Sequence, residues 1–432
     1  MIKVANQFFW NILDQLSGTL RSIIISIVAA RILTVDELGV LMVAISLRAI
    51  FQSFCTLGLD RSFVFLYNPK TKESLKLSTF QLKTFLSIIS VVVVYIYLLY
   101  TTPEIRPTSE TIYIAIVFAS ILLTPLDVLD YVNKSKKENQ INAKARIYML
   151  AFVIISRAAV LLLQSEIFYH VILIPLDYLI FYSFLLFKTK LKEITSVKNY
   201  TKVNLSRIKK ITFFTIPLGL SSLMFIVKTR LDLLLVSLFL GNYYAGIYSV
   251  FTNFYQATGI GFVAISTVAL PYFRSNKNKI SLYAPLSSFY FIYSVVVSLF
   301  ILLLGEEFIE IIFGNKYSKA YELLKLSIFS IVLWGFQSIR TIYLITIEKT
   351  HLILNLQFFI LLISVTALFF LIDDYGMIGG VYALIIGEFF GAFFLNFFWK
   401  ETRDCLIIQF KSLNLVKSLS TIKKLKSNSN NI

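Results

Sequence analysis

Long apolar stretches recur along this chain of 432 residues, and they constrain its fold more than any other feature. Twelve of them reach about 20 residues, the length that an α-helix needs to cross the hydrocarbon core of a bilayer. Charged residues make up 15% of the chain, whereas soluble domains carry about 25%. We therefore predict an all-α polytopic membrane protein with spans near residues 8–30, 39–58, 79–100, 111–130, 143–163, 167–187, 211–238, 244–270, 285–304, 321–343, 352–372 and 376–398.

Lys and Arg are distributed unequally among the loops, and this asymmetry predicts the orientation of the helices. One alternating set of loops, together with both terminal segments, holds 29 of the 41 basic residues. The other set holds four, namely Arg31, Arg106, Lys316 and Lys319. Because basic loops stay in the cytoplasm, we predict a multi-pass protein of the cell (inner or plasma) membrane with both termini cytoplasmic.

One longer polar loop separates the predicted helices into two sets of six. We predict an N-terminal six-helix lobe at 1–187, a basic cytoplasmic linker at 188–210, a C-terminal six-helix lobe at 211–400 and a basic cytoplasmic tail at 401–432. The net charge of +17 follows this topology and forms no single basic stripe interleaved with aromatic residues. We therefore do not expect the chain to bind nucleic acid.

Two short segments indicate an internal repeat. Leu33 to Gly39 (LTVDELG) and Leu240 to Gly246 (LGNYYAG) each follow the first helix of a six-helix set, and they lie 207 residues apart. The same shift brings Arg21 onto Lys228. Six helices between the copies give both the same orientation, so we expect an axis along the membrane normal and a central cavity between two lobes.

Several segments also resemble a known family. ARILTVDELGVLMVA (30–44) and TLGLDRS (56–62) resemble the opening of the polysaccharide biosynthesis flippases, the Wzx group of the MOP superfamily. LFLGNYYAGIYSV (238–250) with Pro271, IIFGNKYSKAYELLKL (311–326) and YGMIGGVYAL (375–384) resemble later parts of that family in the same order. The resemblance implies a MATE-like or MOP-like fold of two lobes around a cavity that opens alternately to either side. It also implies transport of undecaprenyl-pyrophosphate-linked oligosaccharide from the cytoplasmic to the outer leaflet.

The resemblance further implies a transporter rather than an enzyme. Its expected partners are the lipid-linked oligosaccharide, membrane lipids, and polymerase and chain-length proteins of an O-antigen or capsule pathway. Two alternatives remain open: a multidrug or small-solute antiporter of the same superfamily, coupled to a cation, and a membrane-embedded polysaccharide polymerase. Outer loops of about ten residues leave little room for a polymerase site, and a cationic interior is atypical of a drug antiporter.

Five cations lie well inside the predicted spans: Arg21, Arg48, Arg157, Lys228 and Arg230. Each costs at least about 2.5 to 3.5 kcal/mol at the bilayer centre, so each should face a cavity or a partner. We predict that Arg21, Arg48, Lys228 and Arg230 bind the pyrophosphate. The alternative is pairing with embedded acids: Asp14 with Arg21, Asp232 with Lys228 or Arg230, and Arg157 with Asp177 or Asp127.

Embedded carboxylates are candidates for ion coupling, because a buried carboxyl can exchange a proton or hold a cation. We predict this role for Asp14 and Asp232, with a proton or sodium gradient as energy source and with no other cofactor and no metal. The cations nearer to helix ends should reach toward the membrane surface, and both histidines should lie at the interfaces. These residues are Lys83, Lys325, Arg340, His170 and His351.

Overall fold

In the computed structural model, the described residues form helices and no strand. They comprise residues 2–67, 72–101, 109–164, 166–189, 205–275 and 283–412. Contacts divide the chain into two compact units, Met1–Gly246 and Ile247–Ile432, called unit 1 and unit 2 below. Within the described ranges, nine helical stretches are long and apolar enough to cross a membrane. The predicted all-α polytopic class is confirmed.

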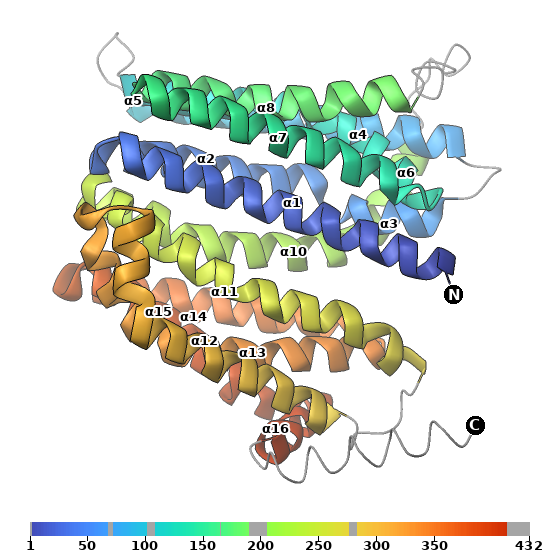
Figure 1. Cartoon of the computed structure of the whole chain (residues 1–432). Helices are drawn as coiled ribbons and strands as arrows, with labels where there is room; N and C mark the ends of the chain where they lie inside the picture. The colour runs from blue at the N-terminus through green and yellow to red at the C-terminus, as the bar shows by residue number, and fades with distance from the viewer. Residues whose placement is uncertain are drawn as a thin grey trace. The chain divides into compact units, whose positions relative to one another are not determined.

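Unit 1 contains the first six predicted spans and the seventh (Figure 1). Its elements are α1 (Ile2–Ile32), α2 (Val35–Thr56), α3 (Leu59–Leu66), α4 (Lys72–Thr101), α5 (Ser109–Ala119), η1 (Ser120–Leu126), α6 (Asp127–Ser135), α7 (Asn139–Leu163), α8 (Ile167–Lys188) and α10 (Leu205–Leu240).

Unit 2 begins within α11, a helix that starts at the end of unit 1. Its elements are α11 (Asn242–Ser275), α12 (Tyr283–Ile312), η4 (Asn315–Tyr317), α13 (Ser318–Thr346), α14 (Thr350–Tyr375), α15 (Met377–Ala392), η5 (Phe394–Phe397) and α16 (Lys400–Ser412). Each of the twelve predicted spans thus falls on helical structure.

The helices depart from the sequence prediction in three places. The predicted loop 59–78 contains the short helix α3, and the predicted span 111–130 changes to a 3₁₀ turn around Pro125. The predicted tail begins with the ordered helix α16. Residues 190–204 of the predicted linker and 413–432 of the predicted tail lie outside the described residues, and the division into lobes 1–187 and 211–400 stays a prediction.

The two repeated segments touch each other in a reciprocal way. A Cβ atom added to Gly39 would lie 2.0 Å from the carbonyl oxygen of Asn242, and one added to Gly246 would lie 2.1 Å from that of Val35. In each copy the touched residue stands four positions before the glycine, so the two contacts are equivalent under the 207-residue shift. This geometry supports the internal repeat, and it requires glycine because backbone meets backbone.

A second close approach joins α10 to α2. A Cβ atom at Gly219 would lie 2.2 Å from the carbonyl carbon of Leu57, the residue that ends α2 in a left-handed conformation. At its other end, α2 begins with a capping box in which Thr34 and Glu37 exchange hydrogen bonds. Small residues that let backbones approach are a main source of helix association in lipid, so α10 packs along α2.

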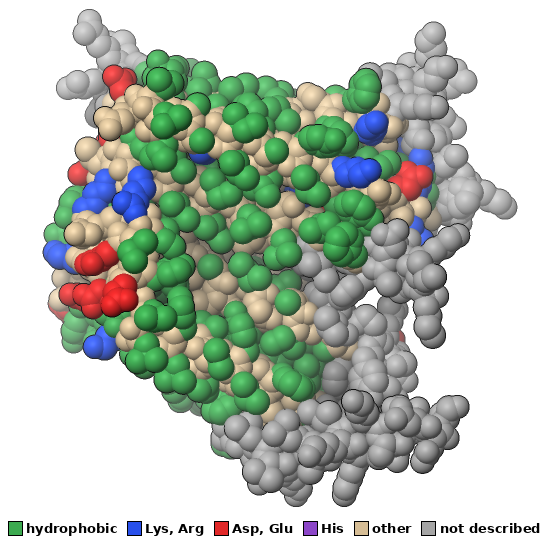
Figure 2. All heavy atoms as spheres, in the orientation of Figure 1, with side chains coloured by type: hydrophobic (Ala, Val, Ile, Leu, Met, Phe, Trp, Pro, Cys, Tyr) green, Lys and Arg blue, Asp and Glu red, His purple; other side chains and the backbone are tan. Residues whose placement is uncertain are grey.

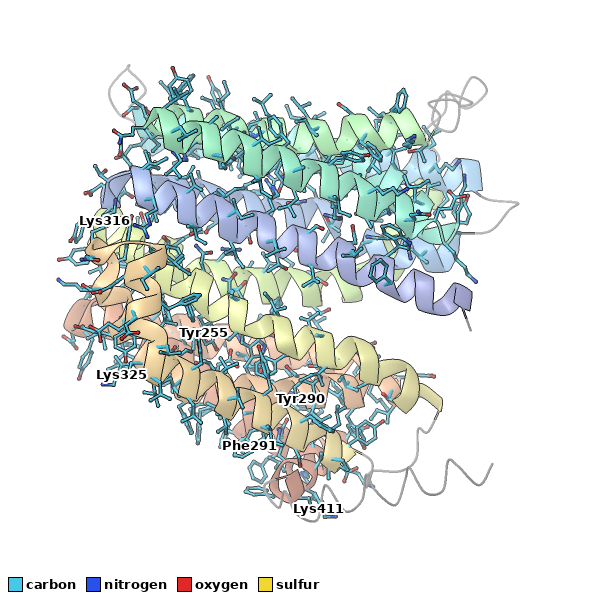
Figure 3. All side chains as sticks on the ribbon, in the orientation of Figure 1. Tyr255, Tyr290, Phe291, Lys316, Lys325 and Lys411 are labelled. Atoms are coloured by element: carbon cyan, nitrogen blue, oxygen red, sulfur yellow. The ribbon has the colours of Figure 1, made fainter. Side chains whose placement is uncertain are left out.

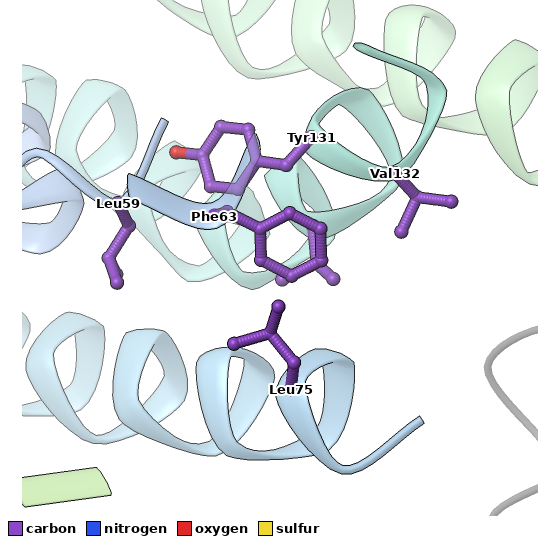
Figure 4. Close-up of a cluster of buried hydrophobic side chains, with 6 residues drawn as sticks. Leu59, Phe63, Leu75, Tyr131 and Val132 are labelled. Carbon is purple, nitrogen blue, oxygen red and sulfur yellow. The ribbon is translucent and has the colours of Figure 1, made fainter. Parts of the chain in front are cut away.

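A compact apolar cluster fixes one end of unit 1 (Figure 4). Phe63 of α3 packs against Leu75 of α4 and against Tyr131 of α6, whose ring centroid lies 5.9 Å away. On the face shown in Figure 2, hydrophobic side chains cover the lengths of the helices and charged side chains gather near their ends. This distribution is the one that a bilayer requires.

The interior of unit 2 is aromatic. Tyr255 of α11 stacks on Trp334 of α13 at a centroid distance of 5.4 Å, and Phe262 meets the same indole edge-on at 5.5 Å. Figure 3 shows Tyr255 and Tyr290 on adjoining helices of this unit. These aromatic contacts hold α11 on α13.

Candidate functional site

Two of the predicted site residues meet at one tyrosine of unit 1. The guanidinium carbons of Arg21 (α1) and Arg48 (α2) lie 4.3 Å and 3.7 Å from the ring centroid of Tyr178 (α8). Each arginine also donates a hydrogen bond to the Tyr178 hydroxyl, at 2.9 Å and 2.8 Å. Cations within about 6 Å of an aromatic face are attracted by its quadrupole, so Tyr178 holds both guanidinium groups side by side.

One carboxylate serves this cluster. Asp177 accepts a hydrogen bond from Arg157 at 3.0 Å, and its same oxygen lies 3.5 Å from Arg21. Asp177 and Arg157 are both fully buried. The predicted alternative of Asp177 as partner of Arg157 is confirmed. Arg48 is held instead by neutral groups, namely Gln52, Ser120 and the Tyr178 hydroxyl.

The cationic cluster, defined as Arg21, Arg48, Arg157, Asp177 and Tyr178, therefore contains three guanidinium groups and one carboxylate. Three of its donors, Nε of Arg21, Nη2 of Arg48 and Nε of Arg157, are buried and lack a hydrogen-bond partner, as does one oxygen of Asp177. Of the four helices that carry it, α2, α7 and α8 are candidate membrane spans. A surplus of positive charge with free donors inside a membrane-spanning unit is suited to binding an anion.

A second charged group of unit 1 is balanced. Asp14 accepts a hydrogen bond from Arg146, whose guanidinium also lies 3.9 Å from Asp130. Asp130 pairs in turn with Lys134 at 2.6 Å. Two acids thus face two bases. The predicted pairing of Asp14 with Arg21 is wrong, because Arg146 of α7 takes the carboxylate and Arg21 turns to Asp177.

Lys83 forms another balanced pair. Its ammonium group lies 2.6 Å from Asp127 and donates to the Tyr131 hydroxyl at 2.9 Å, while Tyr182 donates to the other oxygen of Asp127 at 2.6 Å. The side chain of Lys83 is fully buried. The prediction that Lys83 reaches the membrane surface is wrong, because the half-buried carboxylate of Asp127 binds it.

Arg340 of unit 2 is buried as well, so the same prediction is wrong for it. Its guanidinium donates to the carbonyl of Gly391 and to the Asn396 side chain, and it lies 3.5 Å from the Gln337 amide oxygen. The Gln337 amide nitrogen donates to Glu388. These contacts join α13 to α15 through a polar network in the apolar interior.

The remaining predicted site residues lie on α10. Lys228, Arg230 and Asp232 are half-buried there, and Arg230 interacts electrostatically with Asp232. Their part in binding or coupling stays a prediction. His170 lies one turn into α8, near a helix end as expected, but it is buried, and neither ring nitrogen has a hydrogen-bond partner.

Sequence reasoning missed Tyr178, Gln52 and Ser120. Tyr178 follows the embedded Asp177 directly, and an aromatic residue beside a buried acid was the available signal. Gln52 stands four residues after Arg48 on the same helical face, where it can reach the guanidinium. Ser120 carried no comparable signal, because its contact depends on how α2 packs against the 3₁₀ turn.

Solved transporters of the MOP superfamily share this arrangement of helices. An inward-facing multidrug resistance MATE family transporter aligns over 92% of this chain and 96% of its own, with a TM-score of 0.71 and 14% identity. The lipid II flippase MurJ in an inward closed conformation aligns over 94% and 90%, with a TM-score of 0.73 and 16% identity. At such identities the likeness shows the fold, and the chain is an integral multi-pass membrane protein.

The family follows from the sequence. The profile described as polysaccharide biosynthesis protein matches residues 4–277, so the chain belongs to this family. A curated relative is the capsular polysaccharide biosynthesis protein CapF of Staphylococcus aureus, 26% identical over 222 residues. That match covers 49% of this chain and spans only 55% of the length of the relative. The predicted resemblance is confirmed.

Proposed function

We propose that this protein is a flippase that moves undecaprenyl-pyrophosphate-linked oligosaccharide from the cytoplasmic to the outer leaflet. The product would serve an O-antigen, a capsule or another surface polysaccharide. One observation carries the proposal: the cationic cluster holds three guanidinium groups but one carboxylate, which contacts Arg21 and Arg157 while Arg48 has neutral partners. The family and its capsular relative agree with it.

The charges match the problem that such a substrate poses. A pyrophosphate diester carries about two negative charges, and the cationic cluster has a surplus of two positive ones. At an effective dielectric constant near 20, one contact between unit charges at 4 Å is worth about 4 kcal/mol before desolvation. Two such contacts offset much of the penalty for moving the head group through the membrane-spanning unit.

The energy source is part of the proposal. A proton or sodium gradient would drive transport through Asp14 or Asp232. Asp14 is engaged by Arg146, so a coupling role requires this ion pair to open during the cycle. If transport into vesicles is the same with and without either gradient, the coupling role of both acids is excluded.

The proposal places the chain in the cell membrane with both termini in the cytoplasm. It acts as a transporter without catalysis of its own, beside the polymerase and chain-length proteins of the pathway. The competing functions are a cation-coupled drug antiporter and a polysaccharide polymerase. The antiporter would transport a cationic dye, and the polymerase would lengthen lipid-linked glycans, so each has an assay of its own.

The test uses purified protein in phosphatidylcholine vesicles with a fluorescent undecaprenyl-pyrophosphate-linked saccharide. Accessibility of the probe to a membrane-impermeant quencher reports its transfer between leaflets. We expect wild-type protein to flip the probe, and Arg48→Gln to lower the rate at least tenfold. Arg31→Gln, which changes an exposed arginine on α1, is the matched control and should flip at the wild-type rate. Equal rates for Arg48→Gln and wild type would overturn the assignment of the site.

A further inference from the structure

The helix α16 has two chemically different faces. Its inner face packs on α12 and α13 through Cys405 and Ile408, which are each 1% exposed. Gln409 of the same face donates a hydrogen bond to the carbonyl of Phe336 at 3.3 Å. The helix is therefore fixed on unit 2 by its inner face.

The acids of α16 are used by contacts within the unit. Glu401 lies 3.4 Å from the Lys349 ammonium group, and Asp404 accepts a hydrogen bond from the Tyr343 hydroxyl at 3.2 Å. Both negative charges thus have partners within unit 2.

The outer face combines bases with apolar groups. The exposed positions are spaced at three, four, three and one residues, which places them on one side of a helix. They are Lys400, Arg403, Ile407, Phe410 and Lys411. Ile407 and Phe410 are 49% and 64% exposed, and the adjoining Phe397 and Phe398 are 58% and 62% exposed.

The helix lies at the end of unit 2 where α12 begins and α13 ends. Tyr283 and Tyr343 mark this end, with ring centroids 5.2 Å apart. The loops before α12 and after α13 belong to the basic set of loops that the sequence predicts to be cytoplasmic. Figure 3 shows Lys411 far along the unit from Lys316 and Lys325.

We propose that α16 lies in the membrane surface and binds anionic phospholipid head groups through Lys400, Arg403 and Lys411. A helix with exposed phenylalanines beside bases suits the boundary between acyl chains and head groups, because each kind of side chain then meets its preferred surroundings. Residues 413–432 are poorly suited to cover this basic face themselves, since they contain four lysines and no acid to pair with its bases. The proposal does not depend on the transported substrate.

Trp399, directly before α16, is a natural reporter for this proposal. The full-length Trp10→Phe/Trp334→Phe variant keeps it as the only tryptophan, since the chain has three. The protein is reconstituted in phosphatidylcholine vesicles that contain brominated phosphatidylglycerol or, separately, brominated phosphatidylcholine. We expect the anionic quencher to quench Trp399 more strongly at equal mole fraction.

The charge test adds Lys400→Gln, Arg403→Gln and Lys411→Gln together. Each base near an anionic surface favours association about fivefold, so this triple change should lower the relative affinity for phosphatidylglycerol by about one to two orders of magnitude. The matched control, Lys316→Gln/Lys319→Gln/Lys325→Gln, changes three exposed lysines at the other end of the unit and should keep the preference.

Equal quenching of Trp399 by the two lipids would overturn the proposal, even before any basic residue is replaced. A preference that survives the triple change would overturn the assignment to these residues. Quenching by neither lipid would show that Trp399 lies away from the lipid, and it would also overturn the proposal.

Discussion

Replacement of Asp177 by asparagine tests the charge balance of the cationic cluster most directly. The change removes the one carboxylate that contacts Arg157 and Arg21 among the described residues, at 3.0 Å and 3.5 Å. Arg157 is fully buried, and loss of one partner of a buried ion pair costs about 3 to 5 kcal/mol. We expect Asp177→Asn to lower the free energy of unfolding by about 4 kcal/mol.

The double variant Asp177→Asn/Arg157→Gln separates charge from packing. Removal of both charges leaves no unpaired ion at the fully buried Arg157 position, although Arg21, which is 12% exposed, still loses its carboxylate. We therefore expect the double variant to recover at least about 2 kcal/mol of the loss. The free energies are measured by reversible unfolding in detergent micelles, with Asp374→Asn as the control at an exposed acid of α14. The charges are not coupled as described if the free energy of unfolding of Asp177→Asn lies within about 0.5 kcal/mol of that of wild type. The same conclusion follows if the loss in the double variant equals the sum of the losses in Asp177→Asn and Arg157→Gln.

Three further outcomes are expected. Tyr178→Phe keeps the ring under both guanidinium groups but removes their shared hydrogen-bond acceptor, so the flipping rate should fall several-fold. Tyr178→Leu also removes the ring and should abolish flipping. Equal rates for the two variants would contradict the positioning role of Tyr178. Gly39→Val should destabilise the protein by about 3 kcal/mol or more, whereas Gly18→Val should be tolerated because nothing lies within 4 Å of the added Cβ. The purified yield and the thermal unfolding of the two variants are compared. Burial raises the pKa of the Cys405 thiol to about 12, so the thiol stays neutral at pH 8. Cys405 should therefore react with maleimide only after denaturation. Rapid labelling of the folded protein would show that α16 detaches from unit 2.

The membrane-spanning helices could be predicted because the bilayer imposes a length and a composition on each one. Arg21 and Arg48 could be singled out for the same reason, since a cation within an apolar run is conspicuous. Their surroundings could not be predicted. Tyr178 and Asp177 stand more than 100 residues away from both, and only the packing of α8 against α1 and α2 brings them together.

Lys83 and Arg340 show that the position of a residue within a predicted span does not determine whether its side chain reaches water. Each lies close enough to a helix end to reach water, but each has a fixed partner inside the protein. Sequence shows how far a side chain can extend, whereas the tertiary fold determines whether a nearer partner exists. The helix α16 was missed for a related reason: at 13 residues it is too short to span a membrane, and its apolar residues form only a face.

The reciprocal glycine contact has a consequence for how the two halves of this chain can change. Leu33 to Gly39 and Leu240 to Gly246 share only their first and last residues, although they occupy equivalent places. Each copy supplies both a glycine and the backbone that the other glycine touches, and a side chain at either position would separate the two copies. The sequences around these glycines are therefore free to diverge while the glycines are not. Under the same shift, Arg48 corresponds to Tyr255, so equivalent positions of the repeat can carry different chemistry.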